Sequence, residues 1–272
     1  MKVHHLNCAT FCPPLFAQRV NAAGKLICHC LLIEGEGGLV LVDTGLGQAA
    51  LQAPGRYSPP GSTKMLGARL DPSETAQAQI AALGFAKKDL RHILLTHMDF
   101  DHAGGIADFP DATVHVFEDE YQAATQRATF MEKQRYVTAQ WAHGPHWKRY
   151  TLPEKASSWF GFDSVRALPG TSDEILIVPV TGHSRGHCAI AVRTETGWLL
   201  HCGDAYFYDG EMDPAGRRCT GFLNGFQKIA QFHGPSRVRN QERLRQLRSA
   251  HGGEVQLFCA HDPTEFDQLA RQ

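Results

Sequence analysis

The sequence of 272 residues lacks an excess of charge of either sign, and it lacks a long apolar run. Its 27 lysines and arginines nearly balance 28 aspartates and glutamates, which leaves a formal net charge of −1. We therefore expect neither nucleic acid nor a membrane as a partner, because no overall field attracts them. No stretch approaches the roughly 18 apolar residues that span a membrane, and no secretory signal opens the chain, so we expect a cytoplasmic protein.

The eight cysteines lack the spacing of a disulfide framework and of a C-x-x-C motif. Free cysteine behaves as a small buried apolar residue, so we expect most of them to be reduced and to lie in the core. Histidine is abundant by contrast. There are 15 histidines, and several stand beside acidic residues near the ends of apolar runs. This combination is typical of metal sites.

Apolar patterns typical of strands and patterns typical of helices occur along the whole chain. Hydrophobic residues make up 43% of it, and no linker or low-complexity segment divides it. We therefore expect one domain, 1–272, of mixed α+β structure. Residues 46–70 are expected to form a long loop. The predicted strands are 27–34, 39–42, 93–95, 114–117, 175–180, 188–192, 198–202 and 255–260, and the predicted helices are 72–83, 118–127, 236–250 and one that begins at 262.

Side chains of metal-ligand type follow several of these strands. Four of them, His97, Asp99, Asp101 and His102, lie within six residues directly after the strand 93–95. Such a cluster is not stable in a packed core unless its carboxylates are paired or coordinated. We therefore expect a metal site, and two ions fit the number of ligands better than one. Later candidates are His187, Asp204 and His261.

The segment 96–105, THMDFDHAGG, resembles the His-x-His-x-Asp-His signature of the metallo-β-lactamase-fold hydrolases, and the later motifs follow in the same order. The resemblance implies an αβ/βα four-layer sandwich, in which two mixed sheets are flanked by helices. It also implies a dinuclear site with Asp43 behind it and a bridging hydroxide as nucleophile. The implied ligands are His97, Asp99, Asp101, His102, His187, Asp204 and His261, with Asp204 shared between the two ions.

Asp99 stands where the signature has its second histidine. A carboxylate in place of an imidazole lowers the net positive charge of the metal cluster and replaces a nitrogen ligand with a harder oxygen ligand. We expect two divalent ions, zinc first, with iron or manganese as alternatives. The other interpretation is that Asp99 does not bind metal. Because a di-iron flavoprotein branch of the fold has glutamate at this position, a redox protein with a separate electron donor is a further alternative.

The chain resembles the lactonase and glyoxalase II-like branch of that family, so we predict hydrolysis of an ester-type bond in a small molecule, a lactone first. A thioesterase, a phosphodiesterase or nuclease, and a non-catalytic binding module are the alternatives. The arginines of 237–248 are the only support for the nuclease, and this support is weak. Leu244 and Leu247 give that helix a core face, and a solvated basic face on the other side of such a helix is common. A monomer or homodimer is expected.

Further residues are assigned roles around the metals. Asp101 and Asp204 are expected to act in catalysis, and the resemblance implies that Tyr206 donates a hydrogen bond to the developing oxyanion. Packing beneath the loop is the alternative for this tyrosine. Residues 136–150 show no periodicity, which is typical of a pocket wall or of an ordinary insert. The expected pocket residues are Phe100, Trp141, Trp147 and Tyr208.

Overall fold

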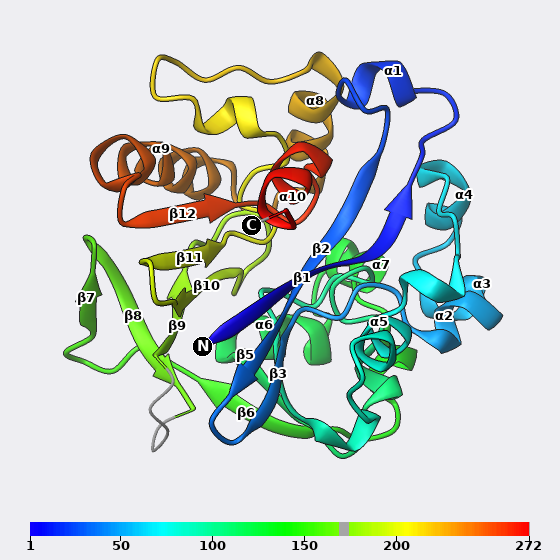
Figure 1. The fold of residues 1–272 in the computed structure, drawn as a ribbon. Helices are drawn as coiled ribbons and strands as arrows, with labels where there is room; N and C mark the ends of the chain where they lie inside the picture. The colour runs from blue at the N-terminus through cyan, green and yellow to red at the C-terminus, as the bar shows by residue number, and fades with distance from the viewer. Residues whose placement is uncertain (169–173, 272) are drawn as a thin grey trace.

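The computed structural model describes residues 1–168 and 174–271, which form two six-stranded sheets (Figure 1). Both sheets are mixed. The first is antiparallel from β1 to β3 and parallel from β3 to β6, and in the second only β11 and β12 are parallel. The strands of the first sheet are β1 (Lys2–Phe11), β2 (Leu26–Gly35), β3 (Gly38–Val42), β4 (Leu90–Leu94), β5 (Thr113–Phe117) and β6 (His146–Tyr150). Those of the second are β7 (Ser157–Trp159), β8 (Phe162–Ala167), β9 (Ile175–Pro179), β10 (Cys188–Arg193), β11 (Trp198–His201) and β12 (Val255–Phe258).

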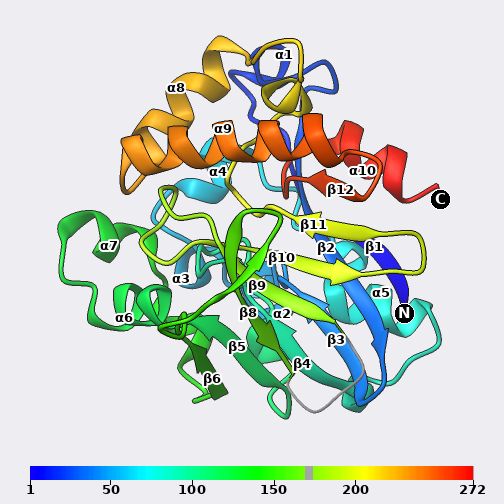
Figure 2. The ribbon, with the colours of Figure 1, turned by 90° about the vertical axis from the view of Figure 1, so that its left-hand side faces the viewer.

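Helices flank the sheets on their outer sides. Figures 1 and 2 show α5 beside the first sheet and α9 beside the second, on opposite sides of the molecule. The helices are α1 (Ala17–Val20), α2 (Gln48–Gln52), α3 (Pro54–Tyr57), α4 (Ser62–Leu66), α5 (Ala76–Ala82), α6 (Glu118–Gln126), α7 (Phe130–Arg135), α8 (Gly221–Ala230), α9 (Gly234–His251) and α10 (Pro263–Leu269). Short 3-10 turns occupy Pro72–Glu74, Lys87–Asp89, Ile106–Asp108, Thr138–Trp141 and Asp209–Met212.

Three buried apolar clusters hold the four layers together. Side chains alternate along a strand, so Leu31 and Ile33 of β2 pack between the sheets while Leu32 faces the helices of the first sheet. In β10, Ile190 likewise faces the first sheet, and Ala189 faces α9. These three cores confirm the predicted sandwich of two mixed sheets flanked by helices.

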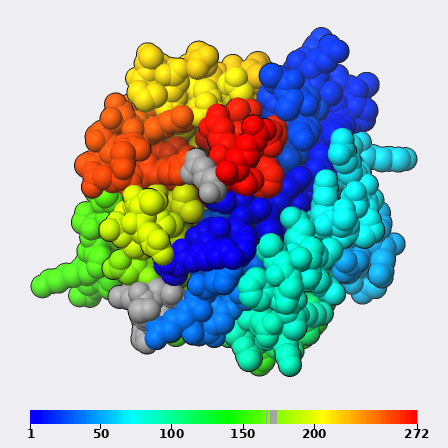
Figure 3. Space-filling model, in the orientation of Figure 1, coloured from blue at the N-terminus to red at the C-terminus, as the bar shows by residue number. Residues whose placement is uncertain are grey.

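The C-terminal helix α10 joins the two halves of the chain. It contacts β1 and β2 of the first sheet, and Figure 3 shows the red C-terminal segment against the blue N-terminal strand. Because α10 follows β12 directly, this packing fixes the loop between them, 259–262, against the start of the chain. His261 lies in that loop.

Most predicted elements are present, with differences at their ends and in the loops. The predicted helix 72–83 begins as a 3-10 turn, and its α-helical part starts after Thr75, which caps it by accepting the N–H of Ala78. The expected loop 46–70 contains α2, α3 and α4. The elements β1, β6, β7, β8, α1, α7 and α8 were not predicted.

Two expectations drawn from composition can be compared with the structure. All eight cysteines are free and six of them are buried, as expected. In the part of the chain that the structure describes, no helix is both long enough and apolar enough to cross a membrane.

Candidate metal centre

Loops at the ends of buried strands bring the candidate ligands together. The loop after β4 carries His97, Asp99, Asp101 and His102, and it lies beside the loops that follow β9, β11 and β12. Strand ends are rigid supports, so side chains from distant parts of the chain meet with little freedom. Three groups of ligand-type atoms result. Two of them share Asp204, and the third, Cys28, Asp101 and His261, shares His261 with one of these two.

The first group consists of His97, Asp99, His183 and Asp204. The Nε2 atom of His183 lies 3.1 Å from Oδ2 of Asp99 and 3.4 Å from Oδ2 of Asp204, and Nε2 of His97 lies 3.4 Å and 3.8 Å from the same two oxygens. Ligands about 2.0–2.1 Å from a tetrahedral ion stand about 3.3 Å apart, so these spacings fit a metal ion. The Nε2 atom of His97 is also buried without a hydrogen-bond partner.

The second group consists of His102, Asp204 and His261. Oδ1 of Asp204 lies 3.1 Å from Nε2 of His102 and 3.0 Å from Nε2 of His261, and the two imidazole nitrogens are 3.4 Å apart. Asp101 adds an oxygen 3.8 Å from Nε2 of His261. The buried thiol of Cys28 is also close to Asp101 and His261. This group therefore fits a second ion, with Asp204 facing both.

Asp43 lies behind the second group and orients His102. Its Oδ2 accepts from Nδ1 of His102 at 2.8 Å, and its two oxygens accept from the N–H and hydroxyl of Thr96 at 2.8 and 2.7 Å. Burial opposes ionisation of Asp43, but His102 outweighs it and holds the pKa of this carboxyl below its usual range. Because Nδ1 of His102 carries the proton, its Nε2 lone pair is free to bind metal.

Two of the other three imidazoles, those of His261 and His97, are oriented in the same way, whereas Nδ1 of His183 is buried without a hydrogen-bond partner. Nδ1 of His261 donates to the carbonyl oxygen of Ile27 at 2.6 Å. Nδ1 of His97 lies 2.9 Å from the hydroxyl of Thr96, which donates its own proton to Asp43 and therefore accepts from the ring. In each case the Nε2 lone pair faces the ligand group.

The structure places His183, and not the predicted His187, in the first ligand group. Both ring nitrogens of His187 are already in use: Nε2 accepts the backbone N–H of Asp204 at 2.9 Å, and Nδ1 donates to the carbonyl of Val180. Burial and the neighbouring His97 hold the pKa of His187 well below its usual value, so the ring is neutral. His187 thus positions Asp204, and its Nε2 lone pair is not free for an ion.

The position of Asp204 depends on the glycine before it. Gly203 has φ +51°, and a Cβ atom there would lie 2.7 Å from Nε2 of His187 and 2.9 Å from Thr96. Glycine alone allows the turn and the close approach. Burial opposes ionisation of Asp204, but His261, His102 and His183 together hold its pKa well below the usual range. The shared carboxylate is therefore charged.

Arg135, which the sequence analysis did not identify, binds Asp99 from the cavity side. Its Nε lies 2.5 Å from Oδ1 and its Nη2 2.8 Å from Oδ2 of the carboxylate, a two-point contact. Burial opposes the charge on Asp99, but Arg135 and then His97 hold its pKa well below the usual range. No sequence motif marks Arg135, because α7 is short and lies far along the chain from 99.

Glu120 of α6, also absent from the predicted set, ties the surrounding loops together. Its Oε1 accepts the N–H of Met98 at 2.9 Å, and its Oε2 accepts the hydroxyl of Ser184 at 2.6 Å and the N–H of Gly186 at 3.0 Å. The buried carboxylate thus holds the loop of His97 against the loop of His183. The sequence did not indicate this role, because Glu120 stands in the acidic first turn of a helix, where glutamate is common.

The structure does not bring Tyr206 to the ligand groups. Its ring is fully buried, and its hydroxyl donates to Oε1 of Glu265 at 2.8 Å, which corrects its prediction as an oxyanion donor. The aromatic ring at the site is that of Phe207, stacked on His261 at 5.1 Å between centroids. Phenylalanine has no hydroxyl, so this ring packs against the ligand without donating to it.

The burial of Glu265 makes the stability of the fold depend on pH. Burial raises the pKa of Glu265 to about 8, against about 4.3 in an unfolded chain. The folded state therefore keeps a proton that the unfolded state loses, so the stabilising contribution is complete below about pH 4.3 and falls by up to about 1.4 kcal/mol per pH unit as pH rises toward 8. Glutamine mimics the protonated acid, so we expect Glu265→Gln to remove this decline.

Urea unfolding of the wild type and Glu265→Gln between pH 5 and pH 8.5, followed by circular dichroism, measures this effect. The variant should gain stability relative to wild type as pH rises. Glu195→Gln, at an exposed site, is the control and should follow the wild type. Parallel curves for wild type and Glu265→Gln would contradict the prediction.

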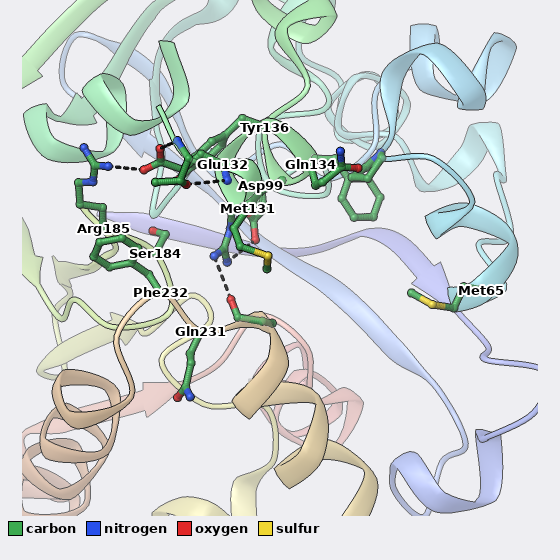
Figure 4. A pocket seen from close by; sticks show the side chains of 15 residues that line it. Met65, Asp99, Met131, Glu132, Gln134, Tyr136, Ser184, Arg185, Gln231 and Phe232 are labelled. Carbon is green, nitrogen blue, oxygen red and sulfur yellow. Dashed lines mark hydrogen bonds and ion pairs between the residues drawn. The ribbon is translucent and has the colours of Figure 1, made fainter. Parts of the chain in front are cut away.

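A cavity of about 330 Å³ opens beside the first ligand group. Asp99, Phe100 and Arg135 form its inner wall, and the apolar side chains of Met131 and Phe232 line it farther out. Figure 4 shows Asp99 and Met131 among the residues that line this cavity, with Met65 of α4 set apart from them in this view. The cavity therefore leads from an apolar mouth to a ligand of the candidate metal centre.

Of the four expected pocket residues, Phe100 lines this cavity. Trp141, Trp147 and Tyr208 are instead half-buried against the core beneath the first sheet, and Trp147 packs edge-on against Tyr121. For the segment 136–150 a pocket wall and an ordinary insert were both left open: Tyr136 lines the cavity, and the segment also contains the 3-10 turn Thr138–Trp141 and the edge strand β6.

Comparison with known proteins agrees with this architecture. The family model of the metallo-beta-lactamase superfamily matches residues 23–218. A probable metallo-hydrolase of Mycobacterium tuberculosis is 41% identical over all of this chain and 83% of its own length, and an N-acyl homoserine lactonase of Bacillus thuringiensis is 31% identical over 69% of this chain and 70% of its own. A crystal structure of mutant AiiA from B. thuringiensis, with N-decanoyl-L-homoserine bound at its active site, superposes with a TM-score of 0.71 at 20% identity and covers 98% of this chain and 95% of that one. The chain therefore belongs to the metallo-beta-lactamase superfamily, as a metallo-hydrolase related to the N-acyl homoserine lactonases.

Proposed function

We propose that the protein hydrolyses lactones with two divalent metal ions, zinc first, one in each ligand group. His97, Asp99, His183 and Asp204 would hold one ion, and Asp101, His102, His261 and Asp204 the other. The observation that carries the proposal is the pair of groups with tetrahedral spacing, joined through Asp204 at the wall of an apolar cavity. Ions bound there would polarise the scissile carbonyl and acidify a water molecule.

The residues of the chain provide orientation, charge and proton transfer. Asp43 and the carbonyl of Ile27 fix His102 and His261 as Nδ1-protonated rings. Asp204 brings its negative charge to the centre of the site. Asp101 has no arginine or lysine partner among the ion pairs of the described residues, whereas Asp99 is bound by Arg135. We therefore assign the proton transfer to Asp101, whose carboxylate would accept the proton that the attacking water gives up and pass it to the leaving oxygen.

The cavity supports a substrate with an apolar substituent. Phe100, Met131 and Phe232 offer it apolar surface, and the arginine at its inner end is paired with Asp99. A neutral ring carbonyl would approach Asp99 and the first ligand group, while an apolar chain would extend toward Met131. This division of polar and apolar surface favours a lactone with an alkyl or acyl chain.

The nuclease alternative gains no support from α9. Arg237 is buried and binds Gln227 and Gln241, Arg245 pairs with Glu242, and Arg248 pairs with Asp209. These side chains serve contacts within the fold. Fewer arginines of α9 are therefore free to contact a phosphate backbone than the sequence indicates.

Removal and return of metal tests the proposal. Protein stripped with a chelator should lose at least about a hundredfold in lactone hydrolysis, and zinc should restore it, because the ligand groups hold no other electrophile. The panel contains lactones with acyl chains of different length, a thioester and a phosphodiester, and the metal content is measured by mass spectrometry. Lactones with an apolar chain should give the highest kcat/KM.

Three results of the same experiment would contradict the proposal. Turnover of the thioester or phosphodiester above every lactone would assign another substrate class. Metal-loaded protein without turnover of any ester would indicate a binding module. Iron in the protein as isolated, without hydrolysis, would support the redox alternative.

A further inference from the structure

The guanidinium of Arg135 lies against the same atoms that the first ligand group offers to a metal ion. Nη2 contacts Oδ2 of Asp99 at 2.8 Å and also contacts Nε2 of His183. We propose that Arg135 is an internal cation that competes with metal for Asp99 and His183 and makes the first group the weaker of two metal sites. This inference rests on the two-metal part of the proposed function.

The competition follows from the donor atoms involved. A neutral imidazole has one lone pair, on the nitrogen that lacks a proton, and an N–H of Arg135 points at that nitrogen of His183. The same lone pair is required for metal binding. An ion can therefore bind His183 only after Arg135 gives up this contact.

Charge adds to the competition. Asp99 and Arg135 together are neutral, so the carboxylate that would attract a divalent ion is already compensated, and a cation entering beside the guanidinium is repelled. In the second group, the ion-pair partners of Asp101 and Asp204 among the described residues are histidines, and neither pairs with a lysine or arginine. The second group keeps its full attraction for a metal ion.

Arg135 is held in this position from its other side as well. Nη1 donates to the carbonyl oxygen of His183 at 2.8 Å and to that of Ala230 at 3.0 Å. These contacts come from two further segments of the chain, so the guanidinium is fixed among Asp99, the His183 loop and the end of α8. A freely mobile side chain would compete weakly, whereas this one is preorganised.

Metal titration of the full-length chain tests the inference without measuring activity. Metal-free protein is titrated with Zn²⁺, and separately with Mn²⁺, against a chromophoric chelator, and bound metal is confirmed by mass spectrometry. We expect two steps in the wild type, with the second ion bound at least about tenfold more weakly than the first, because it must displace a cation. In Arg135→Gln the second step should tighten by about tenfold or more, while the first stays unchanged.

Two variants control for effects unrelated to competition. Arg135→Lys keeps the positive charge and should keep the weak second step. Arg149→Gln removes an arginine that pairs with Glu118 away from the site, and both steps should match the wild type. Circular dichroism checks that each variant is folded. If Arg135→Gln is unfolded, the difference between the two steps in the wild-type titration is the remaining test.

The outcomes separate this inference from the proposed function. Two ions bound with equal affinity by the wild type would overturn the inference and leave the proposed function intact. A second step that weakens or stays unchanged in Arg135→Gln would also overturn it, because Arg135 would then orient Asp99 for the ion or play no part. Absence of any bound metal would overturn both.

Discussion

Replacing Asp204 with asparagine should lower kcat/KM for the best lactone by about a thousandfold or more and should release metal from both ligand groups. The reason is the position of this carboxylate: Oδ1 faces His102 and His261, and Oδ2 faces His97 and His183. Asparagine keeps the shape but loses the charge and one of the two oxygens. Among the residues that the structure describes, no other carboxylate belongs to both groups.

The measurement combines steady-state kinetics with the metal content of the dialysed protein. Asp213→Asn is the matched control, because Asp213 is a surface carboxylate that pairs with Arg218, and it should retain wild-type activity and metal. An Asp204→Asn variant that keeps two ions and most of its activity would show that Asp204 does not join the groups. Loss of one ion alone would restrict it to one group.

The features of the candidate site that the sequence could predict are local ones. The run of ligand-type side chains after 93–95 is visible because β4 is a short apolar strand and its loop carries four of them in six residues. Asp204 and His261 likewise lie in the loops that follow β11 and β12. A strand end places its next residues at the sheet edge whatever the rest of the chain does, so these positions were predictable.

The features that it missed depend on contacts between distant segments. The loop 181–187 contains two histidines, and spacing alone does not show which one has a free lone pair. His187 is excluded only by its bonds to Asp204 and Val180, which exist once β9, β10 and β11 are paired. Arg135 meets Asp99 across 36 positions. Tyr206 lies two residues after Asp204 but points to Glu265, because α10 packs there.

The difference between His183 and His187 predicts opposite effects of two substitutions in one loop. His183→Ala removes a ligand-type nitrogen from the first group, so we expect a loss of about a hundredfold in kcat/KM and of one bound ion per chain. His187→Gln should keep both ions and lose no more than about tenfold in activity, since glutamine can still accept the N–H of Asp204. Its main effect should be a lower melting temperature, because the buried contact with Val180 is altered.

Metal stoichiometry separates the two roles more clearly than activity does. A residue that only orients Asp204 lowers turnover through a small displacement and leaves the number of ions unchanged, whereas a ligand changes that number. His233→Ala, which removes a partly exposed cap at the start of α9, controls for loss of a histidine in general. The opposite result, in which His187→Gln loses an ion and His183→Ala keeps both, would support the sequence-based assignment of His187 as the ligand. The hydrogen bond from the backbone N–H of Asp204 to Nε2 of His187 would then have to break when metal binds.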